Sequence, residues 1–522
     1  MKKSKLFMII SLSVLVITII VSGTYALYKA QLSKNIGVNT TTHGLAYYIN
    51  YVKGTDITAA TLNPSTSYEG GASSDIEFWK KDDSYDIYGK IELTVNTIGT
   101  NLSNSPALKY AVVNNGNVLK EGSLKGTTSG SKVTILKNLY LEQTKQIYTV
   151  YVWLDNSEEL GNISNESLSI SVDCTASLQK EPTAADTIIS LYTSAAKVTA
   201  TNNSITYNTA PSVSLMNDRL GGTTTDLDGG NIRYYGANPN NYIYFNCSDY
   251  SNQTSSTCET WRIIGVFNGK LKLIRGSQIG TYSWDNKNTS TGEESNSGKN
   301  DWTTARLMKL LNPVDYYIND NNDKDSEGNY LGYSLYYNST SGKCYSGQNN
   351  ATVDCDFTST GIKNDETRNM IAETTYNLGG WNTFTVYPNE IYEYERGTTV
   401  YTGRTTTPWT GKIALAYPSD YGYAADLNQC KQTLYNYDNS TCTSNNWMKA
   451  IITNNGSNYG WLLTPYSSDS YDVWHVHSSG FVNYHGNAYT AYGAVPVLYL
   501  SSELGIESGG DGSSSNPYKL SA

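Results

Sequence analysis

Three of the four histidines of this 522-residue chain lie in one short segment, together with two aspartates. His475 and His477 are two positions apart, so on a strand their side chains point to the same side. His485 follows them, and Asp469 and Asp472 precede them. Imidazole and carboxylate groups at such spacing could bind zinc or copper. We favour the alternative, in which they contact a partner on a varied surface, and we predict no metal.

The surrounding segment, 466–492, is dominated by Tyr, Asn, Asp, Ser and His. Antibody binding sites have this composition, because Tyr supplies rigid contact area and Ser and Asn supply adaptable hydrogen bonds. The segment therefore predicts a binding face, although Tyr and Asn are abundant throughout the chain and a general bias is the alternative. Trp474 is explained equally well as a core residue. The candidate ligand-binding residues are Tyr466, Asp469, Tyr471, Asp472, Trp474, His475, His477, Asn483, Tyr484, His485, Asn487, Tyr489 and Tyr492.

Six of the seven cysteines form three couples, each enclosing a polar loop of similar length. Such couples in an exported chain predict loop-closing disulfides, each contributing on the order of 3 kcal/mol. The absence of C-x-x-C argues against zinc. Cys174 is left over and is expected to be a free, buried thiol. The predicted disulfides are Cys247–Cys258, Cys344–Cys355 and Cys430–Cys442.

The sequence also suggests calcium, but only weakly. The segment 323–328 has carboxylates at alternate positions and ends in Gly328, but Ser334 stands where a calcium loop has a bidentate Glu. We interpret it as a polar loop and predict no cofactor. The chain has no Ser-His-Asp order, phosphate-binding loop or dinucleotide glycine motif, so we predict no enzyme activity.

Short strands are expected to position the candidate face. The apolar runs 461–463 and 495–500 flank it and predict buried strands. Upstream, Asn268-Gly269 joins two β-type runs and predicts a type I′ hairpin. Three helices are expected among the loops, over 303–311, 365–378 with an Asp N-cap, and 446–452.

The C-terminal half carries a family resemblance. The order WLL-x-P (461–465), V-W-x-V-x-x-x-G-x-V-N (473–483) and G-x-x-P-V-L (493–498) resembles the end of C-type-lectin-fold proteins. More narrowly, it looks like the formylglycine-generating-enzyme-like branch, which includes the variable proteins of diversity-generating retroelements. GGNIRYYGANPNNYIYFN (229–246), WRIIGVF (261–267) and WTGKIALAYPSDYGYA (409–424) also resemble a recurrent C-terminal unit of exported proteins of the gut Firmicutes type.

This resemblance implies a C-type-lectin-like α+β fold over about half the chain. Relatives have Arg where Val495 stands, so the ion pair of that Arg is not expected here. The oxidase chemistry of the branch needs a pair of active-site cysteines, whereas these cysteines are better assigned to loop pairs.

The N-terminal part predicts export. Three lysines precede an apolar run over 6–21, and small residues up to Ala26 suit cleavage, so 1–26 is a signal peptide or a retained transmembrane helix. Alternating strand patterns over 27–178 predict a β-sandwich. The string Gly23-Thr24-Tyr25-Ala26 and these strands resemble the TasA and camelysin family of Gram-positive matrix and surface proteins. A net charge of −10 without a basic stripe argues against nucleic acid.

Together these features predict a mainly β chain with α+β parts: a signal or anchor (1–26), a β-sandwich (27–178), a linker with a short helix opened by a Thr183–Asp186 capping box (179–211), a C-type-lectin-like domain with disulfide-pinned loops (212–505) and a Gly/Ser-rich tail (506–522). We predict an exported or cell-surface bacterial binding protein, adhesin-like, whose partner is a protein or glycan on another cell or in the matrix. The alternative is a structural matrix or fibre subunit that assembles through the sandwich.

Overall fold

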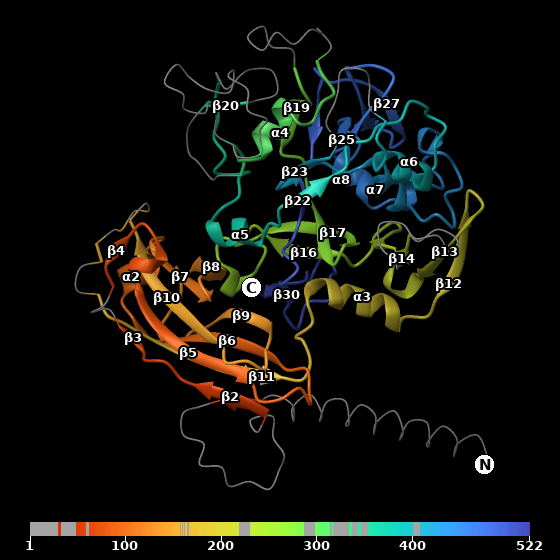
Figure 1. The fold of residues 1–522 in the computed structure, drawn as a ribbon. Helices are drawn as coiled ribbons and strands as arrows, with labels where there is room; N and C mark the ends of the chain where they lie inside the picture. The colour runs from red at the N-terminus through yellow and green to blue at the C-terminus, as the bar shows by residue number, and fades with distance from the viewer. Residues whose placement is uncertain are drawn as a thin grey trace, which may run out of the picture. The chain divides into compact units, whose positions relative to one another are not determined.

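The computed structural model describes residues 30–32, 48–58, 62–156, 158, 160, 162–163, 166–218, 230–286, 298–313, 316, 334–336, 343–345, 353–399 and 408–521. The chain divides into two compact units, Met1–Glu181 and Pro182–Ala522 (Figure 1). In the ranges just given, no helix is long and apolar enough to cross a membrane. The predicted signal or anchor (1–26) and the calcium-like segment (323–328) lie outside them.

The first unit consists almost entirely of strands. Its elements are β1 (Ala30–Leu32), β2 (Ile49–Val52), β3 (Ile57–Thr58), β4 (Pro64–Ser65), η3 (Tyr68–Gly70), β5 (Ala72–Lys80), β6 (Tyr88–Ile98), α2 (Thr100–Asn104), β7 (Leu108–Asn114), β8 (Asn117–Ser123), β9 (Lys132–Tyr140), β10 (Ile147–Asp155) and β11 (Leu168–Ser177).

These strands form the predicted β-sandwich. One sheet has the order β1-β11-β6-β9 and the other β2-β5-β10-β7-β8. Alternate residues of β6, such as Ile91 and Val95, are fully buried and share one core with Val150 and Val152 of β10. This is the pattern of two sheets that pack through one apolar face each. Cys174 on β11 is free and buried in the same core, as expected.

The second unit mixes strands with short helices. Its elements are α3 (Ala184–Ser194), β12 (Val198–Asn202), β13 (Ile205–Ala210), η4 (Pro211–Val213), β14 (Leu215–Asn217), β15 (Ile232–Tyr234), β16 (Tyr242–Phe245), η5 (Tyr250–Asn252), β17 (Glu259–Phe267), β18 (Lys270–Arg275), β19 (Gly280–Ser283), α4 (Arg306–Leu311), β20 (Lys343–Cys344), β21 (Val353–Asp354), α5 (Asp365–Met370), β22 (Thr374–Tyr376), α6 (Pro388–Glu395), β23 (Trp409–Gly411), β24 (Ile413–Ala414), α7 (Pro418–Tyr423), η8 (Leu434–Asn436), η9 (Thr443–Asn445), α8 (Met448–Ile452), β25 (Gly460–Pro465), β26 (Asp472–Val476), β27 (Val482–Asn487), β28 (Ala491–Ala494), β29 (Val497–Tyr499), β30 (Gly505–Ile506) and β31 (Leu520–Ser521).

Two main sheets organise this unit, and the mainly β character of the chain is confirmed. The larger has the order β12-β13-β14-β15-β17-β18-β29-β24, and the smaller β19-β28-β25-β26-β27. Asn268 and Gly269, with φ of 49° and 72°, form the predicted hairpin between β17 and β18. The two expected buried strands are also present, but β25 and β29 belong to different sheets.

From Pro182 on, the predicted linker (179–211) belongs to the second unit, and so does the predicted tail. The predicted capping box is present, because Asp186 N donates to Thr183 Oγ1 at 3.1 Å. Ile188, on the helix that the box opens, is buried in the core of the second unit, so this helix is not part of a free linker. β12 and β13, expected in the linker, extend the larger sheet. In the tail, Tyr518 is buried and its N–H donates to the Tyr242 carbonyl at 2.9 Å. A few buried apolar residues determine how both segments pack. Because the segments are polar on average, their composition did not predict this packing.

The expected helices are shorter than predicted. α4 begins at Arg306, and α8 begins at Met448. α5 ends at Met370 and its N-cap is Asn364, whose side chain accepts from Thr367 N. The end of the predicted 365–378 helix is instead β22, because Thr374 and Thr375 are β-branched and pair with β23. The three predicted disulfides are all present.

A buried ionic cluster joins β15, β18 and α7. Arg233 Nη1 lies 3.0 Å from Asp420 Oδ1, and Arg233 Nε lies 2.5 Å from Asp218 Oδ2. Lys272 forms an ion pair with the other oxygen of Asp420. All four side chains are 1% exposed. Breaking a buried ion pair by removing one partner is strongly destabilising, so the cluster fixes the mutual position of these elements.

Candidate binding face

The predicted contact segment folds into three strands of the smaller sheet, β26, β27 and β28; β27 and the neighbouring strand β25 are labelled in Figure 1. β26 pairs antiparallel with β25 and with β27, and β27 is the last strand in the order of this sheet. The segment therefore has the buried strand β25 on one side, and on the other it ends in β27, which contacts η8.

Burial divides the thirteen candidate residues. Trp474 and His475 are 0% and 1% exposed, and Asp472 is 5% exposed. The structure thus places Trp474 and His475 in the core rather than on a contact surface, because β26 is buried on both sides. Burial lowers the pKa of His475 to about 3, so its ring is neutral. The other ten candidates are partly or well exposed.

Five aromatic residues form a connected surface that we call the aromatic face: Phe384, Tyr435, Tyr466, Phe481 and Tyr484. Tyr484 is central, with its ring stacked on that of Tyr466 at 4.3 Å and nearly parallel to that of Phe384 at 6.0 Å. The ring centroid of Tyr435 lies 4.9 Å from that of Phe384 and 5.5 Å from that of Phe481. Phe384 and Tyr435 are 40% and 38% exposed.

The aromatic face has a rigid support. The ring of Tyr484 lies 5.7 Å from that of the buried Trp474. His477 stacks on Phe481 at 4.4 Å, and its Nε2 is 2.7 Å from the Tyr459 hydroxyl. Its Nδ1 lies 2.7 Å from Ser479 Oγ, so both ring nitrogens are engaged. His475 and His477 both pack on Tyr459, which agrees with the expectation that they share one side.

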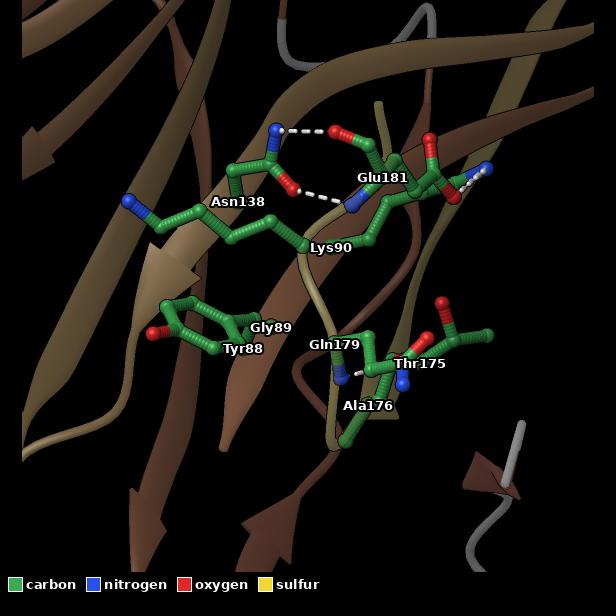
Figure 2. Close-up of a pocket in the computed structure, with 10 residues that line it drawn as sticks. Tyr88, Gly89, Lys90, Asn138, Thr175, Ala176, Gln179 and Glu181 are labelled. Atoms are coloured by element: carbon green, nitrogen blue, oxygen red, sulfur yellow. Dashed lines mark hydrogen bonds and ion pairs between the residues drawn. The ribbon is translucent and has the colours of Figure 1, made fainter. Parts of the chain in front are cut away.

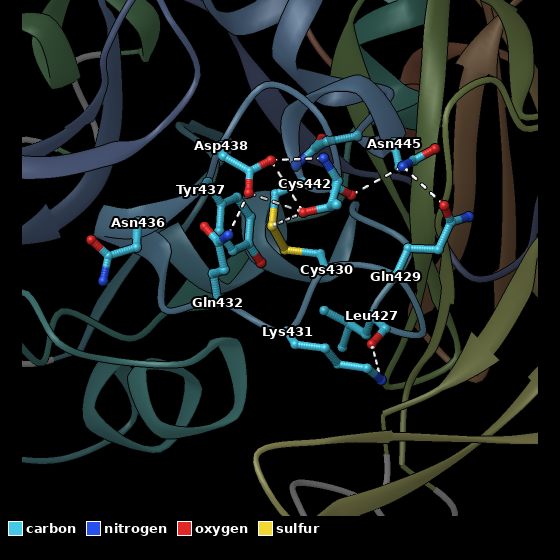
Figure 3. Close-up of a disulfide and its surroundings, with 12 residues drawn as sticks. Leu427, Gln429, Cys430, Lys431, Gln432, Asn436, Tyr437, Asp438, Cys442 and Asn445 are labelled. Carbon is cyan, nitrogen blue, oxygen red and sulfur yellow. Dashed lines mark hydrogen bonds between the residues drawn. A yellow bond between two sulfur atoms is a disulfide. The ribbon is translucent and has the colours of Figure 1, made fainter.

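A disulfide-closed loop brings Tyr435 to the face. Cys430 and Cys442 bracket this loop, which contains η8 (Figure 3). Within it, Asp438 Oδ1 accepts from the N–H groups of Ser440 and Thr441 at 2.8 and 2.7 Å. These hydrogen bonds hold the pKa of Asp438 well below its usual range. The loop is thereby constrained at its ends and at its turn.

Charged and polar groups border the face. Asp469 Oδ1 accepts from the N–H groups of Tyr471 and Asp472 at 3.0 and 2.7 Å. Asp472 Oδ2 lies 3.2 Å from Nδ1 of His485, whose side chain is 62% exposed and contacts the Tyr484 ring at 4.0 Å. Burial raises the pKa of Asp472 to about 6. In the described part of the chain, no three His, Cys, Asp or Glu side chains are placed to hold a metal ion.

The remaining candidates are dispersed. Asn483 Oδ1 accepts from neighbouring N–H groups of its own strand, at 2.7 Å from Tyr484 N. Tyr492 packs on Trp461 at 4.5 Å, and Tyr489 is 45% exposed in the turn before β28. Asn487 pairs with Asp472 in the strand register. The structure therefore brings together Tyr466 and Tyr484, with His485 at their border, and not the whole predicted set.

Sequence reasoning missed Phe384, Tyr435 and Phe481. Phe384 and Tyr435 come from loops far from the predicted segment, so no local pattern marks them. Phenylalanine is nonetheless a usable signal, because the chain has 45 Tyr but only 7 Phe. Among the described phenylalanines, Phe384 and Phe481 alone are not buried. A general Tyr bias does not account for an exposed phenyl ring, Phe384, and a partly exposed one, Phe481, in one place.

The first unit has a small hollow at the end of the sandwich, lined by Lys90, Asn138 and Glu181 among others (Figure 2). Asn138 is hydrogen-bonded to the Glu181 backbone at 2.7 and 3.0 Å, and Lys90 Nζ lies 3.6 Å from Glu181 Oε1. Its volume of about 30 Å³ can hold one or two water molecules. It is too small for a ligand.

Comparison with known proteins adds little. No family model matches the chain, and no curated protein matches it. Among solved structures, an HCR/D mutant matches at 12% identity with a TM-score of 0.15, over 50% of this chain and 76% of that chain. The receptor binding domain of botulinum neurotoxin mosaic serotype C/D matches at the same identity and TM-score, over 52% and 76%. Similarity at this level supports no conclusion about fold or function.

Proposed function

We propose that the protein is an exported, adhesin-like binding protein that holds a protein or glycan partner on the aromatic face. The observation that carries the proposal is the exposure of Phe384 and Tyr435 in a contiguous aromatic surface. Binding energy in interfaces is concentrated in a few aromatic and Arg residues surrounded by polar contacts. The aromatic face, bordered by Asp469 and His485, has this composition.

Two further features support the proposal. Three disulfides suit an oxidising environment outside the cytoplasm. The face is also held in place before binding, because stacked rings, a disulfide loop and a buried strand fix its members. A preorganised surface loses little conformational entropy when a partner binds.

A binding screen with the full-length protein tests the proposal. We expect a hit on a protein or glycan array, repeated with calcium and with chelator, that the Phe384→Ala/Tyr484→Ala double variant loses. Hot-spot aromatics each contribute about 2 kcal/mol or more to binding. Tyr85→Ala is the matched control, since Tyr85 is 44% exposed but lies in the first unit. Equal loss in both variants, or retained binding in the double variant with unchanged melting, would contradict the role of the face.

A second candidate function has one specific observation in its favour. β8 is the last strand of its sheet, and its Val118 and Leu119 are 43% and 39% exposed. Apolar residues on an open edge strand favour pairing with another chain. This supports a matrix or fibre subunit that assembles through the sandwich. Val118→Lys would stop concentration-dependent assembly, measured by light scattering, and would leave array binding intact.

A further inference from the structure

The second unit contains a hollow of about 440 Å³ that lies away from the aromatic face. Strands β16 to β18, the turn after β18 and helix α8 line it, through Tyr242, Glu259, Thr260, Arg262, Arg275, Gly276, Ser277 and Ile451. The volume falls in the range of small-molecule sites, which is roughly 300–1,000 Å³. The hollow is therefore large enough for a sugar.

Arg262 is a buried cation in this hollow whose partners are all neutral. It is 6% exposed, and its guanidinium carbon lies 3.6 Å from the Tyr242 ring and 4.9 Å from the Trp447 ring. Its Nε donates to Asn241 Oδ1 at 2.5 Å and its Nη2 to the Pro239 carbonyl at 3.2 Å. Among the residues that the structure describes, no carboxylate is within ion-pair distance of it. Burial lowers the pKa of Arg262 to about 10, so it remains charged at neutral pH.

The other charges of the hollow cancel. Arg275 forms a two-point ion pair with Glu259, with Nε–Oε2 and Nη2–Oε1 distances of 3.0 and 3.1 Å. Arg262 therefore gives the hollow a net positive charge, although the whole chain carries a net charge of −10. A buried charge is costly unless an opposite charge compensates it, and the aromatic contacts of Arg262 do so only in part.

We propose that this hollow binds an acidic sugar, with Arg262 as the counter-charge of its carboxylate or sulfate group. Guanidinium donors match both groups. The hydroxyls of Thr260 and Ser277 stand at the exposed rim, and the Glu259 oxygens accept hydrogen bonds from sugar hydroxyls. The hollow is far larger than a bare ion requires. This site is independent of the function proposed for the aromatic face.

Ligand-observed NMR titration of the full-length protein tests the proposal with four probes: glucuronate, glucose 6-sulfate, glucose and inorganic sulfate. We expect saturable binding of one or both acidic sugars, displacement by inorganic sulfate, and much weaker binding of glucose. The difference between glucuronate and glucose 6-sulfate identifies the anionic group.

Thr260→Asp places a carboxylate at the rim without altering the core, and like-charge repulsion should weaken acidic-sugar binding by about tenfold or more. Thr206→Asp is the control, because Thr206 is an exposed strand residue of the same unit that does not line the hollow. Arg262→Gln should abolish binding while its melting curve reports on folding.

Three outcomes would overturn the proposal: no saturation with either acidic sugar, saturation with inorganic sulfate alone, or equal weakening by Thr206→Asp. Phe384→Ala should leave this binding intact, so failure of the hollow and failure of the aromatic face are distinguishable.

Discussion

Tyr435 packs against Phe384 with their ring centroids 4.9 Å apart, although each residue belongs to a different loop and neither is on a strand. Tyr435 comes from the loop closed by Cys430–Cys442, and Phe384 precedes α6. The aromatic face is therefore composite: the strands supply Tyr484, and the loops supply the most exposed rings. Its integrity depends on covalent and packing restraints outside the strands.

Removal of the Cys430–Cys442 disulfide should weaken both stability and binding. The Cys430→Ser/Cys442→Ser double variant should lose about 3 kcal/mol of unfolding free energy through loop closure entropy. Partner binding should fall as well, because Tyr435 is no longer held against Phe384. Denaturant unfolding and array binding measure the two effects.

Cys247→Ser/Cys258→Ser is the matched control, since that disulfide closes a loop of similar length without any residue of the aromatic face. It should lower stability to a similar extent and leave binding of the folded protein unchanged. If both double variants bind equally well, the loop does not position the face.

Trp474→Ala should destabilise the protein by about 3–5 kcal/mol, because the indole is fully buried and its removal leaves a cavity. Tyr489→Ala, at an exposed position, should change the unfolding free energy by about 0.5 kcal/mol or less. Thermal or denaturant melts compare the two. A stable Trp474→Ala protein that fails to bind its partner would restore Trp474 as a contact residue.

Glu395→Gln should flatten the pH dependence of stability between about pH 4.5 and 7. Burial raises the pKa of Glu395 to about 7 in the folded protein, so the folded state holds this proton more tightly than the unfolded chain. Its contribution to stability is complete below pH 4.5 and is lost as the pH rises through about 7. Unfolding free energies at several pH values measure the slope. Glu393→Gln, at an exposed position of the same helix, should keep the wild-type slope.

Arg233→Met should cost about 3–5 kcal/mol, because it leaves the buried Asp218 and Asp420 without their shared cation. The matched change at an exposed ion pair is Lys343→Met, opposite Asp354, which should cost about 1 kcal/mol or less. Chemical denaturation distinguishes the two. Equal small losses would show that the buried cluster contributes little to stability.

The sequence predicted those features that depend on local chemistry. The Asn268-Gly269 turn, the Thr183–Asp186 capping box and the three cysteine couples each need only a few neighbouring residues, and all are present. The alternation along β6 likewise marked the sandwich. Features that depend on distant packing were not predictable. Nothing local shows that Phe384 meets Tyr435, or that His475 turns into the core within a polar segment. For Trp474, the sequence left core and contact surface equally open, and the fold places it in the core.

The packing of the second unit against its own last residues has a consequence for how the chain folds. β29 lies between β18 and β24 in the larger sheet, and Tyr518 pairs with Tyr242 on β16. The first helix of the unit is tied to the same region, because Ala184 N donates to the Leu504 carbonyl at 2.6 Å. Contacts between residues so distant in sequence make folding slow. During synthesis from the N-terminus, this unit can therefore close only after residues 497–518 have been made, whereas all strands of the sandwich precede residue 178.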